Sequence, residues 1–128
     1  MENKKKILLV DDEESITRML KLYLDRRGGF EVRTENRGSH AVQVARDFRP
    51  DLIVLDIVMP DADGGAIAQD LGDDPELTSV PIVFLSAIIK EKEMGGQGQA
   101  IGGSGHTYLA KPVEPDVLIG HIQERLGV

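Results

Sequence analysis

Short apolar runs alternate along the chain with longer segments in which apolar residues recur every three or four positions. Three of the runs are nearly continuous in Val, Ile and Leu, which is typical of strands buried on both faces of a parallel sheet. The pattern predicts five strands, over residues 6–10, 30–34, 51–56, 81–86 and 107–110.

The segments between these runs have the spacing of amphipathic helices. Gly28 and Pro50 are stop signals after the first two of them. Ser39 is a candidate N-cap for the second, and Pro115 suits the first turn of the last. The pattern predicts helices over residues 15–27, 40–49, 64–71 and 115–126.

The regular alternation of strands and helices predicts a doubly wound α/β protein, in which helices cover both faces of a parallel sheet. Three layers result, with right-handed crossovers between the strands. The 128 residues suit a single domain, residues 1–128, with a core large enough to fold alone.

One segment, residues 88–106, breaks this alternation. Six glycines fall between Gly95 and Gly105, and each is about 1 kcal/mol less favourable than Ala inside a helix. We therefore expect the fourth helix to be irregular or shortened to about 88–94, followed by a flexible loop. A phosphate-binding glycine loop fits less well, because the stretch has no GxxxxGK[ST] pattern and leads into a strand.

Composition narrows the classes of function. The net charge is −7, so binding to nucleic acid or to an anionic membrane is not expected. The chain has no cysteine, which excludes disulfides and thiolate metal sites. It shows neither a signal-peptide core nor an apolar run long enough to span a bilayer, and we expect a cytoplasmic protein.

Polar residues follow four of the five predicted strands, at the sheet edge where ligands bind in open parallel sheets. Asp11 and Asp12 follow the first strand, and Asp56 ends the third. Ser86 ends the fourth strand, and Lys111 follows the fifth. Three carboxylates, a hydroxyl and an ammonium are therefore expected to converge on one edge.

Most of these residues have an ordinary structural interpretation when taken alone. Asp11 or Asp12 would serve as N-cap of the first helix, Ser86 as a small strand-end residue, and Lys111 as a surface lysine. Asp56 is different, because a carboxylate surrounded by Ile, Val, Leu and Met is unfavourable by several kcal/mol unless it is paired or solvated. The convergence of all five residues on one edge of the sheet favours a functional site over these separate structural roles.

The residue types suggest the chemistry of that site. Clustered carboxylates attract a hard divalent cation, and Mg²⁺ binds one or two carboxylates together with waters and a phosphate oxygen. Asp56 can then act as a nucleophile toward phosphorus and form an aspartyl phosphate. Lys111 and Ser86 are placed to contact the remaining phosphoryl oxygens by charge and hydrogen bond.

Four stretches of the chain resemble the motifs of the response-regulator receiver domain of two-component signalling. The likeness covers essentially the whole chain and is to a receiver of the chemotaxis-regulator type, which implies a flavodoxin-like sheet. The stretches are VDDEES (10–15), LIVLDIVMPDADG (52–64), FLSA (84–87) and YLAKP (108–112).

The resemblance also implies roles for individual residues. Asp56 is the phosphoacceptor, and Asp11 and Asp12 bind Mg²⁺ together with Asp56 and the backbone carbonyl of Val58. Ser86 is the switch hydroxyl that turns toward the phosphoryl group.

Three further features are implied near the fifth strand. Lys111 contacts the phosphoryl group. Tyr108 matches the aromatic residue that swings inward as the switch hydroxyl moves, and it would be half-buried in the unswitched state. The peptide bond between Lys111 and Pro112 is often cis in the family.

The chain departs from the family pattern in two places. The glycine-rich segment falls where the family has its fourth helix, so we expect output to run through another surface. Val58 and Ile88 are apolar and bulky at two positions that, in the family, tune the access of water to the phosphoryl group. We therefore expect slow hydrolysis of the aspartyl phosphate.

The resemblance implies a phosphoacceptor protein that takes its phosphoryl group from a sensor histidine kinase or a phosphotransfer protein. It then changes conformation and signals to a downstream protein. Such a protein is not an enzyme beyond its own phosphoryl transfer and autodephosphorylation. A homodimer is compatible with the sequence, and so are a single-domain regulator and a receiver within a longer protein.

Three alternatives compete with this interpretation. A receiver-like docking module would never be phosphorylated. An aspartyl-phosphate phosphohydrolase would carry a second Asp two residues after its nucleophile, where this chain has Val58. A flavin mononucleotide binder would have a Ser/Thr/Gly-rich loop in place of DDEES. The spacing of the histidines suits no metal site; they are His40, His106 and His121.

Overall fold

The computed structural model describes residues 4–86 and 107–128 of the chain. Its centre is a sheet of five parallel strands in the order β2-β1-β3-β6-β7. The five predicted strands are confirmed, and their bounds differ from the predicted ones by at most one residue. They are β1 (Lys5–Val10), β2 (Phe30–Glu35), β3 (Leu52–Asp56), β6 (Ile82–Ser86) and β7 (Thr107–Ala110).

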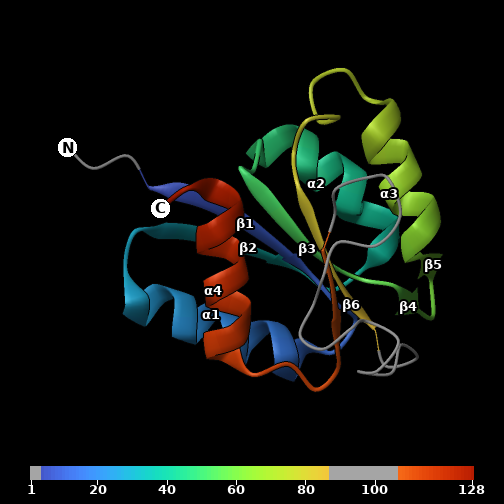
Figure 1. The fold of residues 1–128 in the computed structure, drawn as a ribbon. Coiled ribbons are helices and arrows are strands. Elements are labelled where there is room, and N and C mark those ends of the chain that lie inside the picture. Colours follow the sequence, from blue (N-terminus) through green and yellow to red (C-terminus); the bar gives the residue numbers. More distant parts are fainter. Residues whose placement is uncertain (1–3, 87–106) are drawn as a thin grey trace.

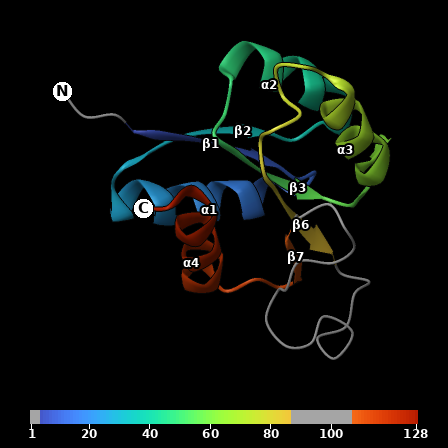
Figure 2. The same ribbon diagram turned by 45° about the horizontal axis from the view of Figure 1, so that its top comes forward.

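Helices cover both faces of this sheet, as predicted. Figures 1 and 2 show α1 and α4 on one face and α2 and α3 on the other, which makes three layers. The predicted fourth helix and the glycine-rich segment lie outside the described residues. The helices are α1 (Glu14–Arg27), α2 (Ala41–Phe48), α3 (Gly64–Asp73) and α4 (Pro115–Leu126).

The two faces of the sheet have separate cores because successive side chains of a strand point to opposite sides. In β1, Ile7 and Leu9 pack with residues of α1 and α4. Leu8 and Val10 point the other way and pack with residues of α2 and α3. All four are buried, so the continuous apolar run that predicted the strand reflects burial on both faces.

The order of the strands locates the expected ligand site. From β1 the chain first adds β2 on one side and then crosses to add β3, β6 and β7 on the other. The direction of winding therefore reverses between β1 and β3, and ligands of such sheets bind outside the carboxyl ends of these two strands. Asp11 follows β1 directly and Asp56 ends β3.

The start of α2 differs from the prediction. A 3₁₀ turn, η1 (Gly38–His40), precedes the helix, so Ser39 lies within the turn and does not cap α2. The backbone N–H groups of Gly38 and Ser39 donate to the carboxylate of Asp61, over 3.2 and 3.1 Å. The prediction was wrong because an acid from a distant segment, rather than the local serine, satisfies these free donors.

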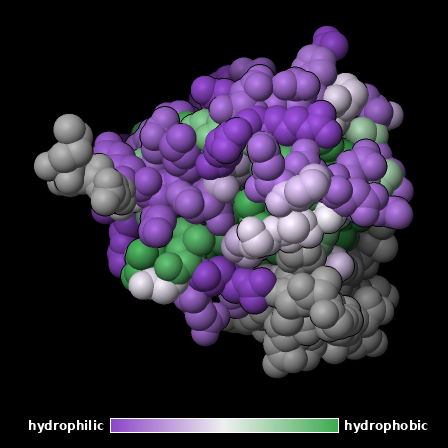
Figure 3. Space-filling view, turned by 90° about the horizontal axis from the view of Figure 1, so that it is seen from above, coloured by the Kyte–Doolittle hydropathy of each residue, from purple (hydrophilic) through white to green (hydrophobic). Residues whose placement is uncertain are grey.

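The surface is mainly polar where it can be seen over α2 and α3. Figure 3 shows hydrophilic side chains over most of this face, with only small separate apolar areas. Among the described residues, no helix combines the length and the apolar character needed to cross a membrane.

Candidate functional site

The loop after β1 brings the first acidic residues to the sheet edge. The backbone N–H of Asp11 donates to the carbonyl of Glu35 at the end of β2, over 3.1 Å. Its Oδ1 accepts the backbone N–H of Glu13 over 2.9 Å. Glu13 occupies the N-cap position of α1, so neither Asp11 nor Asp12 is that cap. The side chains of Asp11 and Asp12 are therefore not used to cap the helix.

Lys111 joins the ends of three strands. Its backbone N–H donates to the carbonyl of Ser86 over 2.9 Å, which fixes the chain after β7 against the end of β6. Its ammonium nitrogen lies 2.9 Å from Oδ2 of Asp11 and 3.2 Å from Oδ2 of Asp56. The side chains of these two acids are almost fully buried, and that of Lys111 is mostly buried. The lysine is therefore a structural partner of both carboxylates and not a surface lysine.

Glu13 is a further acid near the lysine that the sequence analysis did not single out. Its Oε1 lies 3.9 Å from the ammonium nitrogen of Lys111, and its side chain is exposed. At that separation and exposure the pair contributes little to stability. Glu13 adds negative charge at the mouth of the site. The run DDEE gave no means of telling which of its acids faces the lysine.

Three carboxylates form a cluster that fits a divalent cation. One oxygen each from Asp11, Asp12 and Asp56 lies within 4.8 Å of the others. Asp11 and Asp56 are buried and Asp12 is exposed, so the cluster opens toward solvent on one side. The buried Oδ2 of Asp11 is an ion-pair partner of Lys111, and no described backbone or hydroxyl group donates a hydrogen bond to it. Oxygen ligands with a spare buried lone pair suit a hard cation such as Mg²⁺.

Burial and mutual repulsion perturb the charges of the site. Burial raises the pKa of Asp56, the nearby Asp11 carboxylate raises it further, and Lys111 only partly opposes the shift. Burial alone would lower the pKa of Lys111, but its contacts with Asp11 and Asp56 outweigh that effect and the pKa is raised. The ammonium thus stays charged and partly neutralises the two buried acids.

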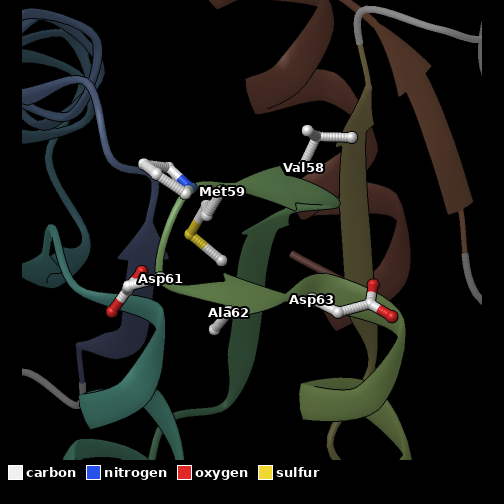
Figure 4. A pocket seen from close by; sticks show the side chains of 6 residues that line it. Val58, Met59, Asp61, Ala62 and Asp63 are labelled. Carbon is white, nitrogen blue, oxygen red and sulfur yellow. The ribbon is translucent and has the colours of Figure 1, made fainter.

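The chain after Asp56 forms a small hairpin that the sequence analysis did not predict. It consists of β4 (Val58–Met59) and β5 (Ala62–Asp63), which pair antiparallel. The N–H of Val58 donates to Oδ1 of Asp56 over 3.3 Å. The first residue of the hairpin is therefore hydrogen-bonded to this carboxylate. Residues of the hairpin line an open pocket with a volume of about 450 Å³. Figure 4 shows the side chains around it.

The return of the hairpin to α3 depends on Gly64. Its N–H donates to the carbonyl of Ile57 over 2.8 Å. A Cβ atom at this position would lie 2.5 Å from the carbonyl oxygen of Asp56 and 2.5 Å from Cα of Ile57. Only glycine allows the start of α3 to approach the backbone of Asp56 so closely. Asp63 caps the helix by accepting the N–H of Gly65.

The remaining predicted residues that the structure describes lie on β6 and β7 or directly after β7. Ser86 is buried at the end of β6, beside Leu85, which pairs with Asp56. Tyr108 is half-buried, as expected for the unswitched state, and its ring stacks on Phe84 with centroids 4.6 Å apart. The peptide bond between Lys111 and Pro112 is cis. Ile88 lies outside the described residues.

Known proteins share both the sequence pattern and the fold. The family model for the response regulator receiver domain matches residues 7–123. The transcriptional regulatory protein GltR of Pseudomonas aeruginosa is 34% identical over 97% of this chain, and the chain spans about half (50%) of that protein. The polar-differentiation response regulator DivK of Brucella anthropi is 30% identical, with 96% of this chain and 97% of that protein covered.

Solved structures agree with these matches. The chemotaxis response regulator CheY4 of Vibrio cholerae has a TM-score of 0.79 at 28% identity, covering 95% of this chain and 98% of that chain. A putative response regulator from Chloroflexus aurantiacus has a TM-score of 0.79 at 27% identity, covering 98% of this chain and all of that one (100%). With the family model matching most of its length, the chain belongs to the response regulator receiver domain family.

Proposed function

We propose that the protein accepts a phosphoryl group on Asp56 in a reaction that requires Mg²⁺. The observation that supports this most strongly is the placement of the Lys111 ammonium between the buried carboxylates of Asp11 and Asp56. Neutralising these charges stabilises a dianionic phosphoryl group beside them. Asp11, Asp12, Asp56 and the carbonyl of Val58 would hold the Mg²⁺, which supplies positive charge against the phosphoryl oxygens.

The transfer is a displacement at phosphorus. A carboxylate oxygen of Asp56 forms a bond to phosphorus while the bond from phosphorus to the donor atom breaks, and the donor leaves with that electron pair. Lys111 stays protonated at neutral pH and contacts the transferred oxygens, so it contributes charge and not a proton. Asp56 acts as a nucleophile only when it is deprotonated, which the nearby positive charge favours.

The donor is proposed to be a sensor histidine kinase or a histidine-containing phosphotransfer protein, which fits membership of the family. The protein then acts as a phosphoacceptor that signals to a downstream protein, and it is not an enzyme with turnover. A cytoplasmic location suits such donors. Ser86 and Tyr108 would be the residues that change conformation, since Ser86 ends β6 beside the site and Tyr108 lies on the neighbouring strand β7.

The chemical nature of the bond provides the test. After incubation with acetyl phosphate and Mg²⁺, the phosphorylated peptide is mapped by mass spectrometry before and after treatment with hydroxylamine. An acyl phosphate on the peptide that contains Asp56 is cleaved by hydroxylamine, whereas a phosphate on a serine or threonine is not. A stable phosphate on another peptide would contradict the proposal, and so would labelling that persists in Asp56→Asn.

A further inference from the structure

Asn36 makes two hydrogen bonds that connect β2, the end of β1 and α1. It directly follows β2, and its Nδ2 group donates to the backbone carbonyl of Asp11 over 2.8 Å. The same group donates to Oγ1 of Thr17 over 3.0 Å. Thr17 is buried on α1, and its hydroxyl donates to the carbonyl of Glu14 over 3.1 Å. Both hydrogens of the amide group are therefore used.

The bond to Asp11 bears on the acidic cluster itself. The carbonyl of Asp11 belongs to the peptide group that links Asp11 to Asp12, so fixing its direction also fixes the directions in which the two side chains leave the backbone. The end of β2 holds Asp11 from both sides, because Glu35 accepts its N–H and Asn36 donates to its carbonyl.

We propose that Asn36 is a positioning residue for the metal ligands Asp11 and Asp12, an inference that rests on the proposed function. It touches neither the cation nor the phosphoryl group. Its role is to hold the Asp11–Asp12 peptide in the orientation that lets both carboxylates share one ion. Residues that hydrogen-bond to metal ligands without touching the metal typically contribute about 10- to 100-fold to metal affinity, as their substitution shows.

A purely structural role is the alternative, because the bond to Thr17 also ties β2 to α1. Two substitutions separate the roles. Asn36→Ala removes both hydrogen bonds, whereas Thr17→Val removes the bond to the helix and leaves the bond to Asp11. Val is close to Thr in shape, so the packing under α1 is kept. The two readouts are the dissociation constant for Mg²⁺, measured by calorimetry, and the melting temperature without Mg²⁺.

We expect both variants to melt below the wild type, but only Asn36→Ala to bind Mg²⁺ about tenfold more weakly. Thr17→Val should remain within about twofold of the wild-type affinity, since its ligands keep their support. Equal Mg²⁺ affinities for wild type and Asn36→Ala would overturn the positioning role while leaving the proposed function intact. Failure of the wild type to bind Mg²⁺ would overturn both.

A measurement on the wild type covers the case in which Asn36→Ala does not fold. In a Mg²⁺ titration followed by NMR, the side-chain amide resonances of Asn36 should shift along the same binding curve as the backbone amides of Asp12 and Asp56. Backbone shifts at the site without any change at the Asn36 amide group would overturn the proposal.

Discussion

The ammonium nitrogen of Lys111 lies 3.2 Å from Oδ2 of Asp56. The two residues come from distant parts of the sequence, and the side chain of Asp56 is almost fully buried while that of Lys111 is 13% exposed. A buried carboxylate of this kind needs a positive partner, and the lysine supplies it in the described structure. The same carboxylate is the proposed phosphoacceptor, so stability and chemistry depend on the same charges.

Removing the lysine should therefore destabilise the protein. In Lys111→Met the carboxylates of Asp11 and Asp56 lose their shared cation, and we expect a decrease of about 2 kcal/mol in the free energy of unfolding without Mg²⁺. The loss stays below that of a fully buried pair because the site opens to solvent beside Asp12. Denaturant unfolding with and without Mg²⁺ measures it, and Mg²⁺ should stabilise the variant more than the wild type.

A matched control is available on α1. Lys21 pairs with Asp25 over 2.7 Å, and both side chains are 43% exposed. The Lys21→Met variant should lose less than about 1 kcal/mol, as is usual for surface pairs. If Lys111→Met were no less stable than Lys21→Met, the lysine would not be neutralising buried charge.

Because the pKa of Asp56 is raised in the folded protein, the free energy of unfolding depends on pH. The unfolded chain loses this proton near the ordinary value of 3.8, whereas the folded chain keeps it to higher pH. Between these two values the unfolded state binds fewer protons than the folded state, so the stability due to this residue falls as the pH rises. At neutral pH the ionised carboxylate therefore opposes folding.

Asp56→Asn should remove this effect. We expect its melting temperature at pH 7, without Mg²⁺, to exceed that of the wild type by about 4 °C, which corresponds to about 1 kcal/mol in a domain of this size. The difference should shrink as the pH falls toward 3.8. Melting curves across this range test it, and a variant that melts lower than the wild type at pH 7 would contradict the assigned direction.

The close approach of α3 to Asp56 predicts that Gly64 tolerates no side chain. In Gly64→Ala the new Cβ atom would meet backbone atoms of Asp56 and Ile57 at 2.5 Å, and backbone cannot rotate away. We expect a loss of about 3 kcal/mol in the free energy of unfolding, at the upper end for overpacking.

The neighbouring glycine is the control for that substitution. A Cβ atom at Gly65 would lie 3.5 Å from Oδ1 of Asp63, which is an ordinary contact. Because alanine is the better helix former, Gly65→Ala should be neutral or slightly stabilising, by up to about 1 kcal/mol. Equal effects of the two substitutions in urea unfolding would show that steric contact at Gly64 does not matter.

The apolar residue two positions after the proposed phosphoacceptor predicts a long-lived aspartyl phosphate. Val58 follows Asp56 by two residues, and its exposed side chain offers water no hydrogen-bonding group. The double variant Val58→Asn plus Ile88→Glu should shorten the lifetime of the phosphoryl group at least about tenfold, within the range that a positioned polar group gives to proton transfer. Decay of radiolabelled phosphate from the protein measures this, and an unchanged rate would show the prediction to be wrong.

The sheet could be predicted well because a strand that is buried on both faces appears in the sequence as a continuous run of apolar residues. The buried residues of β1, β3 and β6 are apolar up to the carboxyl end of each strand, and a polar residue stands at that end or directly after it. The positions of Asp11, Asp56 and Ser86 at one edge therefore follow from the topology of a parallel sheet. Their convergence with Lys111 could be predicted for the same reason.

Contacts between distant segments could not be predicted, because no local sequence pattern indicates them. The hairpin formed by β4 and β5 has strands of two residues, too short for any periodicity. Asp61 satisfies the start of η1 across 22 residues of chain, so Ser39 looked like the cap. Asn36 lies in a polar turn, ENRGSH, where nothing distinguishes it from its neighbours. Its two bonds become visible only when the ends of β1 and β2 are brought together.

The most direct test of the account is the intact mass of the protein after incubation with acetyl phosphate, with and without Mg²⁺, beside Asp56→Asn. We expect a gain of one phosphoryl group in the wild type that requires Mg²⁺ and is absent from the variant. No gain in the wild type, or an equal gain in Asp56→Asn, would contradict the phosphoacceptor role and would favour a receiver that acts only by docking.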